Sequence, residues 1–138
     1  MIPTQYLNSL KLHEGLRLKP YTDTVGKTTI GYGRNLDDRG IFPAEAEAML
    51  LHDAEEAWDS AAKLVRAWPA LDDVRQSVLA EMVFNLGAGR FLGFKNMLAA
   101  VNDGDYYAAA NQMLASLWAG QVKGRAETLA KRMRTGVW

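Results

Sequence analysis

The sequence predicts an α+β fold that is mostly helical, with one small antiparallel β lobe near the amino end. β-branched and aromatic residues with interspersed glycines gather between residues 16 and 33, a composition typical of short antiparallel strands. Elsewhere apolar residues recur at the spacing of a helix. We expect one domain over residues 1–138, with a β lobe at about 14–42. A helix at about 43–65 would join it to a helical lobe made of about 66–138 and the N-terminal helix.

The amino end is expected to form a short helix over residues 3–13, since Leu7 and Leu10 repeat at helical spacing. Gly15 is placed to end that helix. The strands of the β lobe follow, with the hairpin tip at residues 25–27. Residues 35–42, which are rich in Asp and Gly, are expected to form a loop.

The remaining sequence predicts helices. A long helix over 44–64 is followed by one that Asp72 caps and that runs to about Leu86, with little polar surface. Further helices are expected over 93–101, 105–118 and 125–134, separated by 87–89, 102–104 and 120–124. Two lobes imply a cleft, and clefts hold ligands.

Composition limits the chemistry. The chain has 138 residues, of which 49% are hydrophobic and 23% charged, an ordinary globular balance. It has no cysteine, which excludes disulfides and thiolate metal sites, and His13 and His52 are its only histidines. We therefore expect no metal and no cofactor.

The net charge is zero but unevenly spread. Residues 37–59 hold eight acidic residues against one Arg, and residues 90–138 hold seven basic residues against three acidic ones. A basic end can attract an anionic polymer, although two ordinary solvated faces explain the pattern equally well. No nucleic-acid-binding motif accompanies the basic residues, so no nucleic-acid partner is expected. The sequence shows neither a basic leader nor a run of about 20 apolar residues, so stable membrane insertion is not expected either.

Two carboxyl groups near the amino end suit acid–base chemistry. Glu14 lies at the end of the first predicted helix, where the negative end of the helix dipole favours the proton-donating form. Asp23 lies nine residues later, in the β segment, and a chain reversal after the helix would bring it across from Glu14. One protonated and one ionised carboxyl group across a groove is the minimum machinery for glycoside hydrolysis. Thr29, on the adjoining strand, has a hydroxyl group able to hold a water molecule.

Residues 14–33, EGLRLKPYTDTVGKTTIGYG, resemble the catalytic signature of the T-even phage lysozymes, glycoside hydrolase family 24. That signature is Glu, eight residues, Asp, five residues and Thr. Residues 82–87, MVFNLG, are similar to the family's central helix. Trp118, residues 124–126 and residues 134–138 are similar to its carboxy-terminal helices. The resemblance covers nearly the whole chain in order, and it implies a lysozyme-like fold.

The resemblance implies a muramidase, or endolysin, that hydrolyses the β-1,4 bond between N-acetylmuramic acid and N-acetylglucosamine in peptidoglycan. Glu14 would be the general acid. Asp23 would stabilise the oxocarbenium-like transition state and, together with Thr29, position the attacking water. The family is generally described as inverting. Matching the later blocks assigns substrate contacts to Asn35, Phe84, Met97 and Gln112, and identifies Arg125 with a family Arg that pairs with the catalytic Glu.

Some residues depart from the family pattern. Arg34 stands where the best-known member has His, so a known interlobe His–Asp pairing is not expected. The loop between Gly33 and Pro43 is short, which suggests a reduced β lobe. The neutral net charge also weakens the expectation of fast electrostatic capture by an anionic cell wall.

Other functions are less consistent with these residues. A lytic transglycosylase makes an anhydro product without water, and would need neither Asp23 nor Thr29. A peptidoglycan-binding module without activity would not need Glu14, and a metal-dependent amidase lacks ligands. The expected setting is a monomer made in the cytoplasm of the host bacterium, which acts on the periplasmic wall after release through a holin and so lyses the cell.

Overall fold

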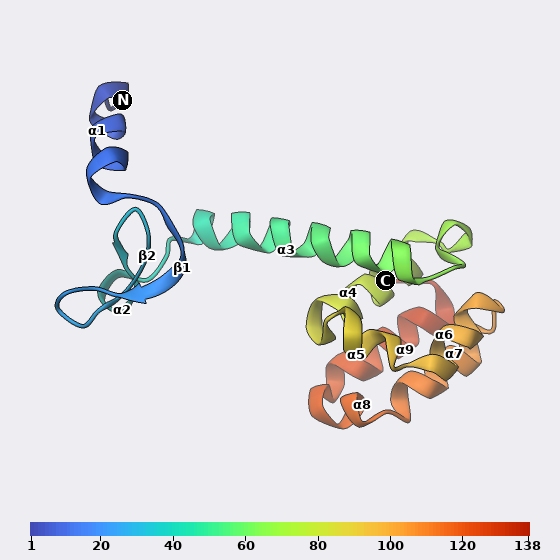
Figure 1. Ribbon diagram of the computed structural model, residues 1–138. Helices are drawn as coiled ribbons and strands as arrows, with labels where there is room; N and C mark the ends of the chain where they lie inside the picture. The colour runs from blue at the N-terminus through green and yellow to red at the C-terminus, as the bar shows by residue number, and fades with distance from the viewer. The chain divides into compact units, whose positions relative to one another are not determined.

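The computed structural model describes all 138 residues, which form two compact units, Met1–Ala48 and Met49–Trp138. The boundary between the units falls within the long helix α3 (Pro43–Leu64). An α+β, lysozyme-like fold is confirmed: a small antiparallel sheet lies in the first unit and most of the helices lie in the second (Figure 1). Each unit is described in turn.

The first unit begins with helix α1 (Thr4–Glu14), as predicted. The glycine that follows, Gly15, has φ 70°, a backbone conformation that ends a helix at little cost for glycine. No residue of α1 is buried. Glu14 is the last residue of α1, directly before Gly15, so its side chain lies where the chain turns toward the sheet.

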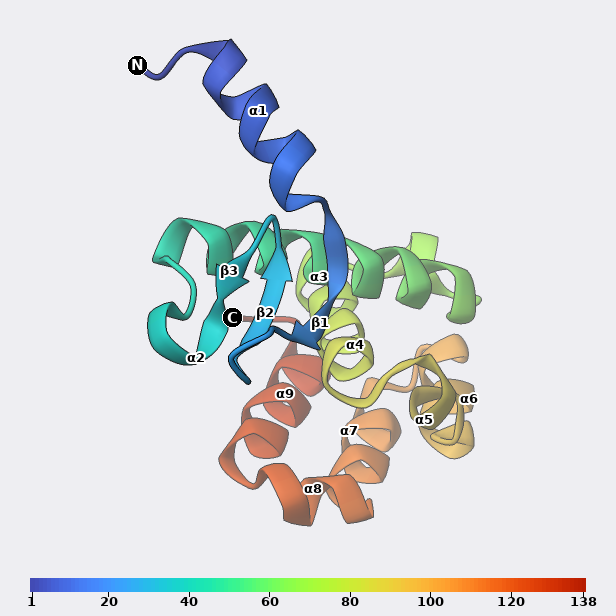
Figure 2. The ribbon, with the colours of Figure 1, turned by 60° about the vertical axis from the view of Figure 1, so that its left-hand side comes forward.

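The sheet has three antiparallel strands in the order β1 (Arg17–Thr22), β2 (Thr28–Gly31) and β3 (Arg34–Asn35), and Figure 2 shows them side by side. The expected hairpin tip is confirmed. It closes through hydrogen bonds from Asp23 N to Lys27 O, 2.9 Å, and from Gly26 N to Asp23 O, 3.1 Å. The pairing between β1 and β2 is irregular between Arg17 and Tyr21.

The expected loop at residues 35–42 is wrong in part, because residues Leu36–Arg39 form a short helix, α2. Its cause is a side-chain cap: Asn35 Oδ1 accepts a hydrogen bond from Asp38 N, 3.0 Å. Gly40 then ends the turn with φ 60°. A capping side chain thus starts a helical turn in a segment of loop-like composition.

The second unit is built around α4 (Asp73–Leu86), which buries six residues and is capped by Asp72 as predicted. Helix α7 packs against both α6 and α9, and α4 packs against α9. Buried side chains of this unit form one apolar core that includes Leu79, Met82, Phe91, Met113 and Leu129. The bounds of the remaining helices are as follows: η1 Trp68–Ala70, α5 Ala88–Leu92, α6 Lys95–Asn102, α7 Tyr106–Leu114, α8 Leu117–Val122 and α9 Gly124–Thr135.

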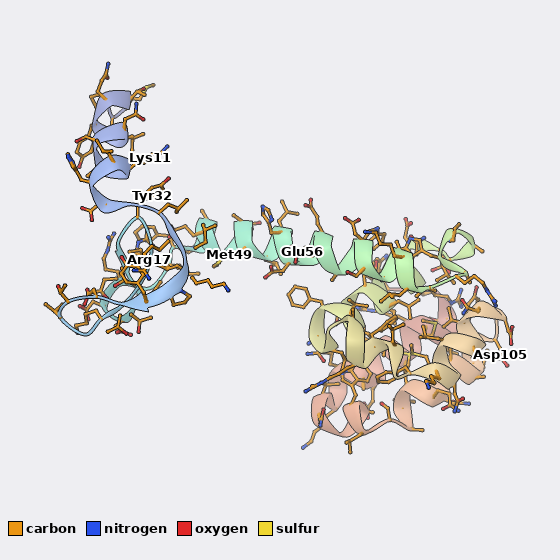
Figure 3. The ribbon with its side chains drawn as sticks, viewed as in Figure 1. Lys11, Arg17, Tyr32, Met49, Glu56 and Asp105 are labelled. Carbon is orange, nitrogen blue, oxygen red and sulfur yellow. The ribbon has the colours of Figure 1, made fainter.

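Three expectations for this unit are wrong. The single helix expected over 105–118 is two helices, because Ser116 leaves helical geometry and its hydroxyl accepts a hydrogen bond from Ala119 N to start α8. Helix α8 then passes through Gly120, in a segment expected to be a break. Helix α5 was also not anticipated between Gly87 and Gly93. The start of α7 at Asp105 is confirmed (Figure 3), where that carboxylate accepts a hydrogen bond from Ala108 N, 3.0 Å.

Candidate active site

Glu14 is exposed and lies beside the connection between β2 and β3. Its Oε2 is 3.3 Å from the point where a Cβ would lie on Gly33, the nearest heavy atom to that point. Gly33 has φ 89°, and its neighbour Tyr32 is exposed (Figure 3). The absence of a side chain at position 33 therefore leaves room for the Glu14 carboxyl group.

Asp23 directly follows β1 and is half-buried. Its Oδ1 accepts two backbone hydrogen bonds, from Val25 N at 3.0 Å and from Lys27 N at 2.8 Å. The second oxygen, Oδ2, has no hydrogen-bond partner within this unit. The hairpin thus holds the carboxylate by one oxygen and leaves the other free to accept a proton or a hydrogen bond.

Thr29 lies in the central strand, pairs with Tyr21 on one side and Asn35 on the other, and is only 3% exposed. Its hydroxyl group donates a hydrogen bond to Lys27 O, 3.0 Å. Since a hydroxyl has one proton, the remaining capacity of Oγ1 is that of an acceptor. A water molecule at Thr29 would therefore be oriented by donating to this oxygen.

Lys27 was not singled out in the sequence, yet its backbone contacts both Asp23 and Thr29. Its side chain forms an ion pair with Asp38 on α2, 3.1 Å, and this hydrogen bond raises the pKa of the Lys27 ammonium. The next residue, Thr28, donates its N–H to Asp37 Oδ2, 2.8 Å. Lys27, which directly precedes β2, and Thr28, its first residue, are therefore both bound to α2, which restrains the strand that carries Thr29. The run of two aspartates after a capping Asn was the only indication of this in the sequence.

Asn35, expected to contact substrate, caps α2. Its Oδ1 binds Asp38 N and its Nδ2 donates to Asp38 Oδ2, 2.9 Å. Both ends of the amide are engaged within the helix turn, and the substrate contact stays a prediction.

The remaining predicted residues lie in the second unit, in two places. Phe84 and Arg125 line a cavity of about 380 Å³ together with Trp58 and Glu81. Arg125 Nε is 2.8 Å from Glu81 Oε2, an ion pair that the sequence analysis did not anticipate. The pairing of Arg125 with Glu14 stays a prediction.

Met97 and Gln112 line a second, larger cavity of about 800 Å³. Met97 is buried, with 1% of its surface exposed, whereas Gln112 is exposed. Met97 therefore belongs to the core and to the floor of the cavity, and Gln112 belongs to its polar rim. Met97 and Gln112, which the resemblance assigns to substrate binding, therefore line the same cavity although they lie on different helices.

Two further features bear on function. No group of three or more His, Asp or Glu side chains is arranged to hold a metal ion. None of the helices combines the length and the apolar character required to cross a membrane.

The chain is similar to known proteins over most of its length. The sequence model described as phage lysozyme matches residues 11–135. Similar proteins include the endolysin of Salmonella phage P22, 32% identical over 96% of this chain and 93% of that protein. Probable T4-type lysozyme 1 of Dictyostelium discoideum is 28% identical over 92% of each chain. The pre-baseplate central spike protein Gp5 of Enterobacteria phage T4 is 31% identical over 92% of this chain, which spans only 27% of that protein.

Proposed function

The chain belongs to the phage lysozyme family and is a glycoside hydrolase that acts on peptidoglycan, and we propose that Glu14, Asp23 and Thr29 carry out its reaction. The bond cleaved is the β-1,4 link between N-acetylmuramic acid and N-acetylglucosamine. Glu14 donates a proton to the leaving oxygen. Asp23, as the anion, stabilises positive charge that develops on the sugar ring.

The observation that best supports this proposal is the arrangement of Asp23 and Thr29 around Lys27. Asp23 has one free carboxylate oxygen, and Thr29 presents an acceptor oxygen because its proton is bound to Lys27 O. A water molecule has two protons to donate, one to each of these oxygens. Such a water has a lone pair directed elsewhere, which is the requirement for attack on the anomeric carbon.

The route to products follows from this arrangement. Attack by a positioned water inverts the configuration at the anomeric carbon, as opposed to a covalent intermediate that would retain it. In the balanced reaction one water is consumed, the glycosidic C–O bond breaks, and the leaving oxygen takes up the proton from Glu14. Asp23 accepts a proton from the attacking water.

Product analysis tests the reaction. Purified sacculi are digested and the fragments are analysed by mass spectrometry, with the anomeric configuration followed by NMR. We expect reducing N-acetylmuramic acid ends that carry the mass of one added water. Anhydro ends would overturn the hydrolytic mechanism in favour of a lytic transglycosylase, and reducing N-acetylglucosamine ends would overturn the bond assigned.

Substrate contacts are proposed at Asn35, Phe84, Met97 and Gln112, with Arg125 in a supporting role. For Phe84 the support is its exposure, 44%, on a helix that buries six of its residues, and its place in the lining of the smaller cavity. Exposed aromatic rings suit sugar faces because their apolar surface is then covered on binding.

The biological role follows from the activity. We propose that the enzyme is an endolysin, a monomer that lyses the host bacterium after it passes from the cytoplasm to the periplasmic wall through a holin. The names of related endolysins, including that of phage P22, support the role in lysis. Expression with and without a holin tests the route of release. Wall degradation and lysis at full rate without a holin would contradict it.

A further inference from the structure

Helix α2 packs against strands β2 and β3 (Figure 2), next to the hairpin that carries Asp23 and Thr29. The strands of this sheet are short, with six, four and two residues. Taken by itself, the first unit buries no apolar side chain, and Thr29 is its only buried residue. A sheet this small needs support from a core or from a neighbouring helix. Polar contacts with α2 supply that support here.

Four residues form a closed ring of contacts that includes Thr29. Thr29 pairs with Asn35 in the sheet, and Asn35 Nδ2 donates to Asp38 Oδ2, 2.9 Å. Asp38 Oδ1 binds Lys27 Nζ, 3.1 Å, and the carbonyl oxygen of Lys27 accepts the hydroxyl proton of Thr29, 3.0 Å. Both oxygens of the Asp38 carboxylate are therefore engaged. Because the ring is closed, Thr29 cannot move relative to α2 without breaking one of these contacts.

Asp37 holds the backbone beside this ring. Its Oδ2 accepts the N–H of Thr28, 2.8 Å, and a hydrogen bond to a carboxylate is one of the stronger kinds. That N–H belongs to the same peptide group as the Lys27 carbonyl, which accepts from Thr29 and also from Asp23 N, 2.9 Å. A peptide group is planar, so fixing its N–H also fixes the direction of its C=O. Asp37 therefore sets the orientation of the oxygen that binds the Thr29 hydroxyl.

We propose that Asp37 and Asp38 are positioning residues for the hydrolysis. They act through Lys27 and Thr28 rather than on the substrate. Asp37 orients the Thr29 hydroxyl, and with it the lone pair offered to the attacking water. Asp38 holds Lys27, whose N–H fixes one oxygen of Asp23. This inference rests on the proposed function, in which Asp23 and Thr29 hold that water.

Two substitutions of Asp37 separate its hydrogen bond from its charge. Asp37→Asn keeps an acceptor oxygen for the Thr28 N–H and loses the charge, whereas Asp37→Ala loses both. Activity is measured on soluble glycan strands, well below the unfolding temperature of either variant. For Asp37→Ala we expect kcat to fall about tenfold with KM unchanged, because a small misplacement of reacting groups slows the chemical step. Asp37→Asn should recover most of that loss. Equal kcat values for the two variants, whether both low or both normal, would overturn the proposal.

The same loss of kcat is expected for Asp38→Ala, which frees Lys27 Nζ and Asn35 Nδ2 together. Asp53→Ala is the matched control, because Asp53 is exposed and forms no ion pair or hydrogen bond within its unit. It removes the same charge and should leave kcat unchanged. A loss in the control equal to that of Asp38→Ala would assign the effect to net charge and overturn the role of Asp38.

Combining Asp37→Ala with Thr29→Val tests whether Asp37 acts through Thr29. If it does, the double variant should be little slower than Thr29→Val alone, whereas independent effects would multiply. Multiplied losses would overturn the inference. A slow Thr29→Val beside a normal Asp37→Ala would sink only the inference, while full activity of Thr29→Val would sink the proposed function at that residue.

Hydrogen exchange at the Thr28 amide measures the contact without catalysis. Exchange should be faster in Asp37→Ala than in the original protein, since the amide loses its acceptor, and should stay slow in Asp37→Asn. Unchanged exchange in Asp37→Ala would show that Asp37 does not hold this peptide group, even in a protein that cleaves no glycan.

Discussion

Asp23 and Thr29 are bound to opposite sides of one residue. Lys27 donates its N–H to Asp23 Oδ1 at 2.8 Å and accepts the Thr29 hydroxyl proton at its carbonyl oxygen at 3.0 Å. The two side chains therefore share a reference point in the hairpin, and a shift of Lys27 moves both. Since α2 holds the Lys27 side chain through Asp38, the short helix that follows the sheet restrains the hairpin that carries these residues.

Removing the Thr29 hydroxyl should affect activity more than stability. Thr29→Val keeps the shape of the side chain and removes one of the two hydrogen bonds to the Lys27 carbonyl, which still accepts from Asp23 N. The loss of one hydrogen bond should cost about 0.5–1.5 kcal/mol of unfolding free energy. Without the acceptor for water, hydrolysis should fall at least about tenfold. Thr29→Ser restores the hydroxyl and is the control. Denaturant titrations and sacculus turbidity measure the two effects, and equal activity of the Val and Ser variants would exclude a role for the hydroxyl.

The Glu14→Gln variant should fold normally and hydrolyse peptidoglycan much more slowly. The side chain is exposed and forms no hydrogen bond within its unit, so the amide replaces it without structural cost. A general acid contributes about 10² or more to the rate, and turbidity loss of purified sacculi should fall by that factor. Thermal unfolding should be unchanged. Retention of wall clearance near the original rate would remove Glu14 from the mechanism.

Gly33→Ala should displace the Glu14 carboxyl group. The new methyl group would meet Glu14 Oε2 at 3.3 Å, and the φ of 89° would add backbone strain of about 1 kcal/mol. Gly104→Ala is a matched control, since Gly104 has φ 74° and open space around it. Both variants should lose similar stability in denaturant titrations. Only Gly33→Ala should lower kcat, and an equal kcat for the two would show that the proximity to Glu14 has no catalytic consequence.

The ion pair between Arg34 and Glu45 should make stability depend on pH. Arg34 binds both carboxylate oxygens, at 2.8 and 3.0 Å, and this hydrogen bonding lowers the pKa of Glu45, with a further contribution from Phe42 N. A lowered folded-state pKa stabilises the protein above the ordinary value, 4.5, and that stabilisation is lost as pH falls through the folded-state pKa.

Glu45→Gln should therefore lower the unfolding free energy at pH 7, and the difference from the original protein should shrink well below pH 4.5. Glu47→Gln, an exposed neighbour without an ion pair, controls for the loss of one negative charge. Urea titrations across this pH range measure the effect. A difference that stays constant with pH would show that the pair does not govern this part of the stability.

The structure of the first unit was predictable to the extent that local patterns dictate it. The alternation of β-branched residues and glycines between 16 and 33 predicts the hairpin, and Gly15 predicts the end of α1. Helix α2 was missed because its composition is that of a loop. Besides its cap, it makes contacts from Asp37 to Thr28 and from Asp38 to Lys27, which join residues nine and eleven positions apart and leave no periodic pattern.

The second unit also has helices that local patterns predict and helices that they do not. The start of α4 at Asp72 and of α7 at Asp105 could be predicted because a capping aspartate acts on residues directly after it. The break at Ser116 could not be predicted, because Ser is also tolerated within helices, and only the structure shows that its hydroxyl caps α8.

The sequence by itself was enough to predict the family: residues 14–33, with the spacing of Glu14, Asp23 and Thr29, predict a glycosidase, and the family is confirmed over residues 11–135. A pattern of this kind can be recognised because it lies in one short, contiguous stretch of the chain. Tertiary structure alone decided how these groups are held and what surrounds them. The binding of Asp23 and Thr29 to Lys27 and the space that Gly33 leaves for Glu14 both depend on distances between atoms in the folded chain. Such distances are set by folding and packing, to which each local stretch of sequence contributes only in part.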